Sequence, residues 1–281
     1  MLEEQNLCDI VCRELDLKYD KCDLSDWTNM LERVKNRDKT VKIALVGKYT
    51  KLHDAYLSVV EALSHAGYEN SAIIDIKWVD AETVNKDTVD SLLKDCQGIL
   101  VPGGFGDRGI EGMVCAANYA RVNNIPYLGV CLGMQIAVIE YARNVLNMEN
   151  ANSTEFDLET KYPVIALMPD QFGNIMGGTM RLGAYPCKVK EKTMLHKCYG
   201  DLNISERHRH RYEFNNDFRE QMIENGLTIA GTSPDGKLVE AVEVEKNKFH
   251  VGVQYHPEFK SRPNRANPIF KGFINAAVNM L

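Results

Sequence analysis

The fold of this chain is decided by one stretch, Ile125-Pro126-Tyr127-Leu128-Gly129-Val130-Cys131-Leu132-Gly133. Residues 125–130 form a short apolar run that is typical of a buried strand, and residues 132–146 are typical of a helix. A cysteine between two glycines at this junction matches the pattern of a nucleophile elbow, with Cys in the place of Ser. A sharp strand-to-helix turn lifts the thiol off the sheet, and the glycines remove side chains that would crowd it. We therefore expect Cys131 at the end of a strand in an α/β sheet.

Strand and helix patterns alternate along most of the chain. The predicted strands lie at 41–46, 72–79, 99–101, 228–231, 238–244 and 249–255, and the predicted helices lie at 54–66, 113–122, 132–146 and 269–280. Repeated β-α units of this kind predict an α/β fold with a doubly wound, mainly parallel sheet flanked by helices. Residues 150–215 carry shorter β patterns and irregular loops, which predict an added small β-region. Ligands bind such sheets beyond the carboxyl ends of the strands, where Cys131 and the glycine loop at 102–106 fall.

The composition changes near residue 40. Residues 1–39 are charged and helix-prone, with one helix expected at 4–17 and a second helix that Ser25 caps and that runs to about residue 35. We expect this piece to be a helical linker arm from an upstream domain that the chain lacks. Residues 40–281 then form the main domain.

The overall composition is that of an ordinary globular protein. Of the 281 residues, 44% are hydrophobic and 26% are charged, and the net charge of -6 argues against nucleic acid as a partner. The chain has no run of 18 apolar residues, and its N-terminus is acidic where a signal peptide would be basic, so we expect a cytoplasmic location without membrane contact. The eight cysteines are irregularly spaced and lack a C-x-x-C pair, so we expect neither a disulfide framework nor a metal site.

A second motif, His256-Pro257-Glu258, follows the last predicted strand. A free thiol is mostly protonated at neutral pH, so a catalytic cysteine needs help from a helix N-terminus and a nearby imidazolium. His256 can supply that imidazolium. Pro257 disfavours helical backbone at the residue before it, and extended geometry would place His256 and Glu258 on the same side of the chain. Glu258 can then orient the imidazole, so we expect a Cys131, His256, Glu258 catalytic triad and cysteine hydrolase chemistry.

Acyl transfer also needs donors for the oxyanion that forms in the transition state. The backbone amide of Leu132, directly after the nucleophile, is one candidate. The amides of the Gly103-Gly104 turn are the other, although a simple tight turn would carry the same sequence. The segment Gly47-Lys48-Tyr49-Thr50 faintly resembles the end of a phosphate-binding loop, but the first glycine of that motif is replaced by Lys42 and the motif's Ser or Thr by Tyr49. We therefore expect no phosphate loop there.

Three segments resemble the signatures of the class I (triad-type) glutamine amidotransferases: Pro102–Gly106, Gly129–Gln135 and His256–Glu258. Further segments at 152–156, 177–183 and 206–213 resemble the glutaminase domains of the CTP synthase family. The similarity extends over essentially the whole chain, including Leu24-Ser25-Asp26-Trp27. It implies a flavodoxin-like core and the hydrolysis of L-glutamine to glutamate and ammonia through a glutamyl thioester.

The resemblance also implies which residues contact the substrate. The positions that match glutamine-binding residues of the family are Gly104, Leu132, Gly133, Met134, Gln135, Glu155 and Arg211. Of these, Glu155 is expected to pair with the substrate ammonium group and Arg211 with its other polar end. Arg108 matches a position near the GTP effector. The loop at 169–176 is shorter than in some bacterial relatives, so its lid over the glutamine site is expected to differ.

In the CTP synthase family the ammonia serves the ATP-dependent amination of UTP to CTP, a step of pyrimidine nucleotide biosynthesis. That reaction needs Mg2+ and an N-terminal synthetase domain, and nothing in these 281 residues matches such a domain. The resemblance therefore implies an isolated glutaminase domain without cofactors of its own. It also implies that the full-length enzyme is a cytoplasmic homotetramer.

Alternatives remain open at this point. The same motifs fit another class I cysteine hydrolase, such as a γ-glutamyl hydrolase or a peptidase, and the fold fits a non-catalytic interaction domain. The charged run at 207–213 is typical of a solvated basic face, a nucleic-acid patch or, through His208 and His210, a metal site. A run this short in an acidic chain argues against nucleic acid, and the absence of a nearby third ligand argues against a metal.

Overall fold

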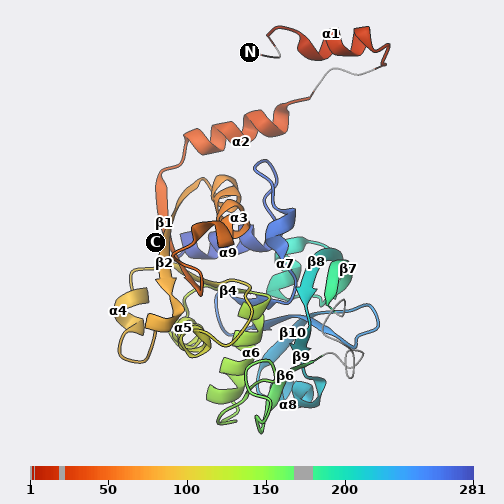
Figure 1. The fold of residues 1–281 in the computed structure, drawn as a ribbon. Coiled ribbons are helices and arrows are strands. Elements are labelled where there is room, and N and C mark those ends of the chain that lie inside the picture. Colours follow the sequence, from red (N-terminus) through yellow and green to blue (C-terminus); the bar gives the residue numbers. More distant parts are fainter. Residues whose placement is uncertain (1, 3, 19–22, 168–179) are drawn as a thin grey trace.

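The computed structural model describes residues 2, 4–18, 23–167 and 180–281. Figure 1 shows the arrangement of its helices and strands. The expectation of a different lid at 169–176 and the first part of the 177–183 segment fall on residues outside this set.

Within the described residues, nine strands form the main sheet. The order across the sheet is β2-β1-β3-β4-β12-β11-β10-β7-β8. The bounds in that order are Ala72–Asp80, Lys39–Gly47, Gly98–Val101, Tyr127–Val130, His250–Val253, Val239–Val244, Leu227–Thr232, Arg181–Val189 and Asn203–His210. A smaller sheet contains β5 (Asn152–Ser153), β6 (Pro163–Leu167) and β9 (Tyr212–Phe214), in the region where a small β-region was expected.

The main sheet changes from parallel to antiparallel at β12. Strands β2, β1, β3, β4 and β12 run parallel to their neighbours, whereas β12, β11, β10, β7 and β8 pair antiparallel. The predicted α/β fold is confirmed, and its sheet is mixed rather than mainly parallel. For β10, β11 and β12 the reason is the length of the connections, because residues 233–238 and 245–249 are too few for a crossover helix and force these strands to turn back. Cys131 lies in the parallel half.

Helices cover both faces of the sheet (Figure 1). One face carries α3 (Leu57–Glu69), α7 (Met194–Tyr199) and α9 (Pro268–Val278). The other face carries α4 (Val89–Leu93), α5 (Ile110–Val122), α6 (Leu132–Asn144) and α8 (Arg219–Glu224).

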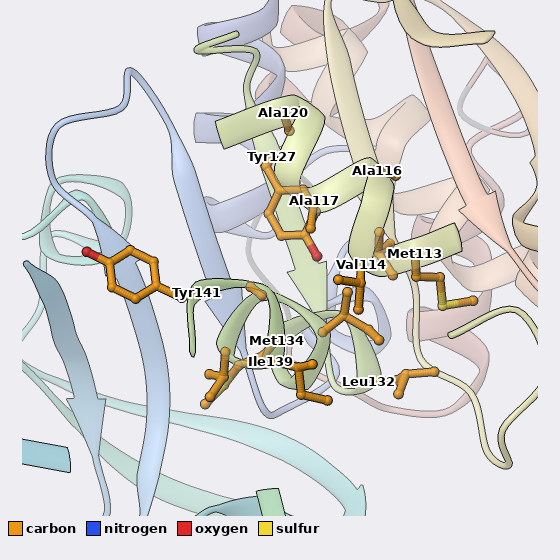
Figure 2. Close-up of a cluster of buried hydrophobic side chains, with 14 of the residues drawn as sticks. Met113, Val114, Ala116, Ala117, Ala120, Tyr127, Leu132, Met134, Ile139 and Tyr141 are labelled. Carbon is orange, nitrogen blue, oxygen red and sulfur yellow. The ribbon is translucent and has the colours of Figure 1, made fainter. Parts of the chain in front are cut away.

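Strand β1 shows why the central strands contain continuous apolar runs, which in β1 is the run from residue 43 to residue 46. Val41, Ile43 and Leu45 join the core under α3 and α9, whereas Ala44 and Val46 join the core under α5 and α6. Successive side chains of a strand point to opposite faces, so a strand that is covered on both faces needs apolar residues throughout. Figure 2 shows the second of these cores, in which side chains of α5 and α6 surround the ring of Tyr127 from β4.

Three glycines allow α6 to lie directly against the sheet. A Cβ atom on Gly129 would come within 2.4 Å of the carbonyl oxygen of Gly133. One on Gly133 would come within 2.1 Å of the oxygen of Val101, and one on Gly252 within 2.9 Å of Cα of Met134. The first turn of α6 is therefore held by backbone contacts with β3, β4 and β12.

The first two helices precede the sheet. Among the described residues, α1 (Leu7–Glu14) has no buried side chain and α2 (Ser25–Lys35) buries Met30. Ser25 begins α2 rather than capping it, because Oδ1 of Asp23 accepts the hydrogen bond from its amide at 2.9 Å. The role of these helices as an arm toward another domain stays a prediction. No helix in the described part of the chain combines the length and apolar character needed to cross a bilayer.

Candidate active site

Cys131 occupies a strained turn between β4 and α6. It is the N-cap of α6, and its φ of 52° and ψ of -100° lie where residues with a side chain are rarely found. Its amide donates to the oxygen of Val253 on β12 at 2.7 Å, and its own carbonyl accepts from the amide of Gln135 at 3.3 Å. The first amides of a helix have no partner within the helix and carry a partial positive charge. The elbow predicted from the sequence is confirmed, and it places the thiol where a helix favours an anion.

His256 and Glu258 meet Cys131 at the end of β12. Nδ1 of His256 and Oε1 of Glu258 are 2.8 Å apart, and the His256 amide donates to the oxygen of Arg207 at 2.7 Å. The two side chains meet across a 3-10 turn, η5 (Pro257–Lys260), and not along extended chain as expected. Proline fits the first position of such a turn, because its missing N–H would have no partner there.

The charges of the three groups support each other. Burial disfavours the imidazolium form of His256, but the thiolate of Cys131 and the carboxylate of Glu258 outweigh it and raise the pKa of His256 to about 10. His256 lies next to the glycine loop, since a Cβ on Gly103 would come within 2.8 Å of its Cε1 and 3.6 Å of Cβ of Cys131. The structure thus brings together a thiol, a protonated imidazole and an orienting carboxylate, the groups needed for nucleophilic acyl transfer.

A cavity of about 250 Å³ opens at this point. Its lining combines the triad with the glycine loop and with aromatic side chains: Tyr49, Ala55, Tyr56, Ser58, Val59, Pro102, Gly103, Gly104, Phe105, Cys131, Arg209, His256, Glu258 and Phe259. Gly104 and Leu132, whose amides are the predicted oxyanion donors, are neighbours here, because a Cβ on Gly104 would lie 3.3 Å from Cδ2 of Leu132. Their use as an oxyanion hole stays a prediction.

The remaining residues predicted to bind substrate have different surroundings. Glu155 is half-buried, and its Oε1 accepts from the amide of Gly106 at 3.0 Å, which ties it to the glycine loop. Burial raises the pKa of Tyr212, the Glu155 carboxylate raises it further and the Arg211 guanidinium lowers it. Glu155 and Arg211 therefore both lie near Tyr212, although they come from distant parts of the sequence.

Three predicted positions follow the nucleophile on α6. The side chain of Met134 is buried in the core (Figure 2), and its amide donates to the carbonyl of Cys131 at 3.1 Å. Gly133 has no side chain, and its carbonyl accepts from the hydroxyl of Tyr127 at 2.8 Å. Gln135 is buried with both side-chain bonds directed to protein groups. A substrate contact by Gly133 would thus go through its backbone, and contacts by the other two residues are not visible in this arrangement.

Arg108 and Lys48 flank the glycine loop. Arg108 donates to the carbonyl of Lys48, lies over the ring of Tyr49 at 5.5 Å and pairs with Glu82 at 3.4 Å. Lys48 is buried and its Nζ donates to the carbonyls of Phe105 and Gly106. Burial lowers the pKa of Lys48 to about 8, against the opposing effect of nearby carboxylates. Through these two carbonyls Lys48 holds the glycine loop close to Cys131.

The arrangement of β8 was not predicted from the sequence. The run of charged residues alternates along this strand, with Arg207 and Arg209 exposed and His208 and His210 buried. The carbonyl of Arg209 lies 3.9 Å from Sγ of Cys131 as a hydrogen-bond acceptor. The period of two in the run was the available signal, because alternation predicts a half-buried strand.

A second residue was missed altogether. Gln254, directly after β12, is fully buried and its Nε2 lies 3.7 Å from Sγ of Cys131. No motif marks it in the sequence. Among the described residues, no cluster of three or more His, Cys, Asp or Glu side chains is placed to hold a metal ion.

Comparisons with known proteins agree with this geometry. A family model described as glutamine amidotransferase class-I matches residues 51–276. A CTP synthase from Clostridium kluyveri is 55% identical over 280 residues, which are 99% of this chain and 52% of that protein. A CTP synthase from Listeria innocua is also 55% identical over 280 residues, with the same coverage. The chain therefore spans about half the length of the curated relatives it matches.

One solved structure is similar over most of the chain. The glutaminase domain of Trypanosoma brucei CTPS, determined with bound acivicin, is 40% identical and superimposes with a TM-score of 0.81. The similarity covers 85% of this chain and 94% of that domain.

Proposed function

This chain belongs to the class-I glutamine amidotransferase family, and from that premise we propose that it hydrolyses L-glutamine to glutamate and ammonia. The observation that carries the proposal is the 2.8 Å contact between His256 and Glu258 beside Cys131, in the lining of a cavity of about 250 Å³ next to a glycine loop. A thiol with such partners suits attack on a carboxamide.

The substrate is held by its two ends in this proposal. Glu155 pairs with the α-ammonium group of glutamine, because it is a half-buried carboxylate tied to the glycine loop. Arg211 binds the α-carboxylate, since a guanidinium recognises a carboxylate through two parallel hydrogen bonds. The proximity of both residues to Tyr212 supports a shared subsite.

The reaction then follows from the positions of the groups. Sγ of Cys131 attacks the carboxamide carbon, and the negative charge that develops on the oxygen is stabilised by the amides of Leu132 and Gly104. His256 donates its proton to the departing nitrogen, so that ammonia leaves and a glutamyl thioester remains. Water, deprotonated by His256, attacks the thioester and releases glutamate and the free Cys131. Glu258 keeps the imidazolium oriented throughout.

The fate of the ammonia is the second part of the proposal. The curated relatives are named CTP synthase, and the chain covers about half of their length. We propose that the ammonia of this domain serves the ATP-dependent amination of UTP to CTP in a longer enzyme. The described residues offer no acidic cluster for Mg2+, so no step of the present mechanism passes through metal or nucleotide. Sites for ATP and UTP belong, in this proposal, to a synthetase domain outside the 281 residues, to which helices α1 and α2 connect.

The finer assignments rest on the same family relationship. Arg108 contributes to the response to GTP, the whole enzyme is a homotetramer and it acts in the cytoplasm. Arg108 is half exposed beside the glycine loop, which suits contact with an effector. Gel filtration of the full-length enzyme and the effect of GTP on ammonia release by Arg108→Ala test these assignments.

Active-site labelling tests the glutaminase proposal directly. A glutamine analogue with an electrophilic ketone should modify Cys131, and glutamine but not short peptides should protect it. A peptidase would be protected by peptides, and a γ-glutamyl hydrolase by γ-glutamyl conjugates. A non-catalytic interaction domain would release no ammonia from glutamine and take up no label, which would contradict the proposal.

A further inference from the structure

A buried amide contacts the nucleophile from within the protein. Gln254 has no exposed surface, and its Nε2 points to Sγ of Cys131 at 3.7 Å. It lies between β12 and His256, so the strand that positions the base also positions this amide. The carbonyl oxygen of Arg209 is a hydrogen-bond acceptor for the same sulfur, at 3.9 Å. The sulfur thus has one acceptor, which serves the thiol, and one donor, which serves the thiolate.

The orientation of the Gln254 amide is fixed by its neighbour. Nε2 of Gln135 donates to Oε1 of Gln254 at 3.3 Å and to the carbonyl of Tyr212 at 3.0 Å. A carbonyl can only accept, so the group of Gln135 that faces Tyr212 must be its NH2. The same NH2 group then requires an acceptor on Gln254. The donor end of Gln254 is therefore the end that faces Cys131.

The carbonyl of Tyr212 is itself held by a buried pair of histidines. Nδ1 of His210 lies 3.1 Å from this carbonyl, and Nε2 of His210 lies 3.0 Å from Nδ1 of His208. Burial lowers the pKa of His208 to about 2 and that of His210 to about 3, and the Arg181 guanidinium adds to both effects. Both rings stay neutral at working pH, so His210 donates through Nδ1 and accepts through Nε2. The chain of hydrogen bonds runs in a fixed direction.

We propose that Gln254 is a further catalytic residue, whose side-chain amide donates a hydrogen bond to the Cys131 thiolate and holds it for attack. This proposal rests on the glutaminase function proposed above. A hydrogen bond from a neutral amide stabilises the thiolate without adding a second positive charge beside the His256 imidazolium. Gln135 acts as a positioning residue, because it sets which end of Gln254 meets the sulfur. The titratable and charged groups that line the cavity with Cys131 are Tyr49, Tyr56, Arg209, His256 and Glu258.

Two substitutions test whether Gln254 donates a hydrogen bond or only fills space beside Cys131. Gln254→Met keeps the length of the side chain but removes donor and acceptor. Gln254→Glu keeps an acceptor for Gln135, but once ionised it cannot donate and repels the thiolate. The matched control is Gln97→Met, because Gln97 also makes two side-chain bonds, to the amide of Lys42 and the carbonyl of Asp95, at the other end of the sheet.

The measurement is the rate at which iodoacetamide alkylates Cys131 between pH 5 and pH 10, followed by peptide mass spectrometry with Cys131→Ser as blank. Gln254→Met should slow alkylation at pH 7 by between about tenfold and a hundredfold, the range for one hydrogen bond to a charged atom. Its kcat for glutamine should fall similarly while KM changes less than twofold, since the bond is to the enzyme's own sulfur. At high pH Gln254→Glu should be alkylated more slowly than the wild type. The ratio of the two rates should approach one on acidification, when the introduced carboxyl group regains a proton. Gln97→Met should match the wild type.

The outcomes are distinguishable. If Gln254→Glu follows the wild-type alkylation rate at every pH, Gln254 serves only to support Gln135 and the proposal is overturned. If circular dichroism shows that one of the two Gln254 variants does not fold, the other variant decides the question. A wild-type pH profile of alkylation in that variant would also overturn the proposal. The wild type could release no ammonia from glutamine while substitution of Gln254 still slows the alkylation of Cys131. The proposed glutaminase function would then be wrong, but the hydrogen bond from Gln254 to Cys131 would be supported.

Discussion

Nδ1 of His256 is hydrogen-bonded to Oε1 of Glu258, and this single contact determines which ring nitrogen is available to exchange a proton with Cys131. With Nδ1 engaged, Nε2 is the nitrogen left for Cys131. Both side chains are nearly buried, so their relative position is set by packing and by the η5 turn rather than by solvent.

We predict that Glu258→Gln lowers kcat for glutamine hydrolysis at least about a hundredfold with little change in KM, because an amide can hold the wrong tautomer of the ring and cannot stabilise the imidazolium. Steady-state ammonia release measures this effect. Glu82→Gln, an exposed carboxylate of the Arg108 ion pair, serves as a control for general charge effects. A Glu258→Gln enzyme with more than a third of wild-type kcat would show that Glu258 is not part of the triad.

The pH dependence of the reaction should reflect the raised pKa of His256. Since the protonated form of His256 is favoured up to a pKa of about 10, the ring can donate a proton to ammonia at pH 7 to 9, and activity should fall only as the pH approaches 10. Removal of the Glu258 carboxylate takes away one cause of the raised pKa, so the alkaline limb should move to lower pH in Glu258→Gln. A pH–kcat profile on both enzymes tests this. An unchanged alkaline limb would contradict the assignment.

Replacement of the nucleophile should separate activity from stability. Cys131→Ser and Cys131→Ala should abolish hydrolysis, whereas Cys115→Ser, on the half-buried side of α5, should retain it. Because the φ of residue 131 is 52°, we further expect Cys131→Gly to be more stable than Cys131→Ala by about 1 kcal/mol, the reverse of the usual order. Thermal unfolding of the two inactive variants gives the comparison. Equal stability would mean that the elbow relaxes when the thiol is lost.

Glu155 provides a test of substrate recognition. Glu155→Ala should raise KM for glutamine strongly, because a bound ammonium group that loses its charged partner costs about 2–5 kcal/mol. Glu159→Ala, an exposed carboxylate on the same segment, should leave KM unchanged. A fall in kcat/KM of less than about tenfold, or 1.4 kcal/mol, would indicate that Glu155 only braces Gly106.

Glu206, on the buried side of β8, predicts a pH effect on stability. Its Oε1 accepts from the hydroxyl of Tyr199 and from Nδ2 of Asn267, both at 3.0 Å, and burial raises the pKa of Glu206 to about 7. The folded state then keeps a proton that the unfolded state loses above its ordinary pKa near 4.5, so the wild type loses stability as the pH rises through this window.

Glu206→Gln keeps the accepting oxygen and removes the titration. Its free energy of unfolding, relative to the wild type, should therefore increase by about 2 kcal/mol between pH 5 and pH 8. Urea unfolding at the two pH values measures the difference. A difference that stays constant with pH would show that Glu206 ionises normally within the fold.

The central part of the fold and the proximity of Cys131, His256 and Glu258 could be predicted from the sequence, because local patterns indicate them. Strands β3 and β4 are apolar throughout and β1 is apolar from residue 43 to residue 46, and the Cys131 turn and the His256-Pro257-Glu258 motif each lie within a few residues of sequence. The antiparallel half could not be predicted with equal ease, because strand order depends on which distant segments pair.

The residues that were missed share a physical reason. His208 and His210 look like part of a basic surface until β8 pairs with β7 and turns them inward, where burial keeps them neutral. Gln254 has no charge, and the His256-Pro257-Glu258 motif that begins two residues later gives it no role of its own. Its contact with Cys131 exists only because β12 lies next to β4.

The glycines under α6 determine how this site can be changed. Gly129, Gly133 and Gly252 leave the helix and the sheet in backbone contact, so the height of the thiol above the sheet does not depend on the size of any core side chain. Libraries that vary the volume of the core should therefore yield enzymes of different thermal tolerance but similar turnover. A change of substrate specificity must therefore come from substitutions in the loops around the cavity, since the three glycine positions next to Cys131 have no room for a larger residue.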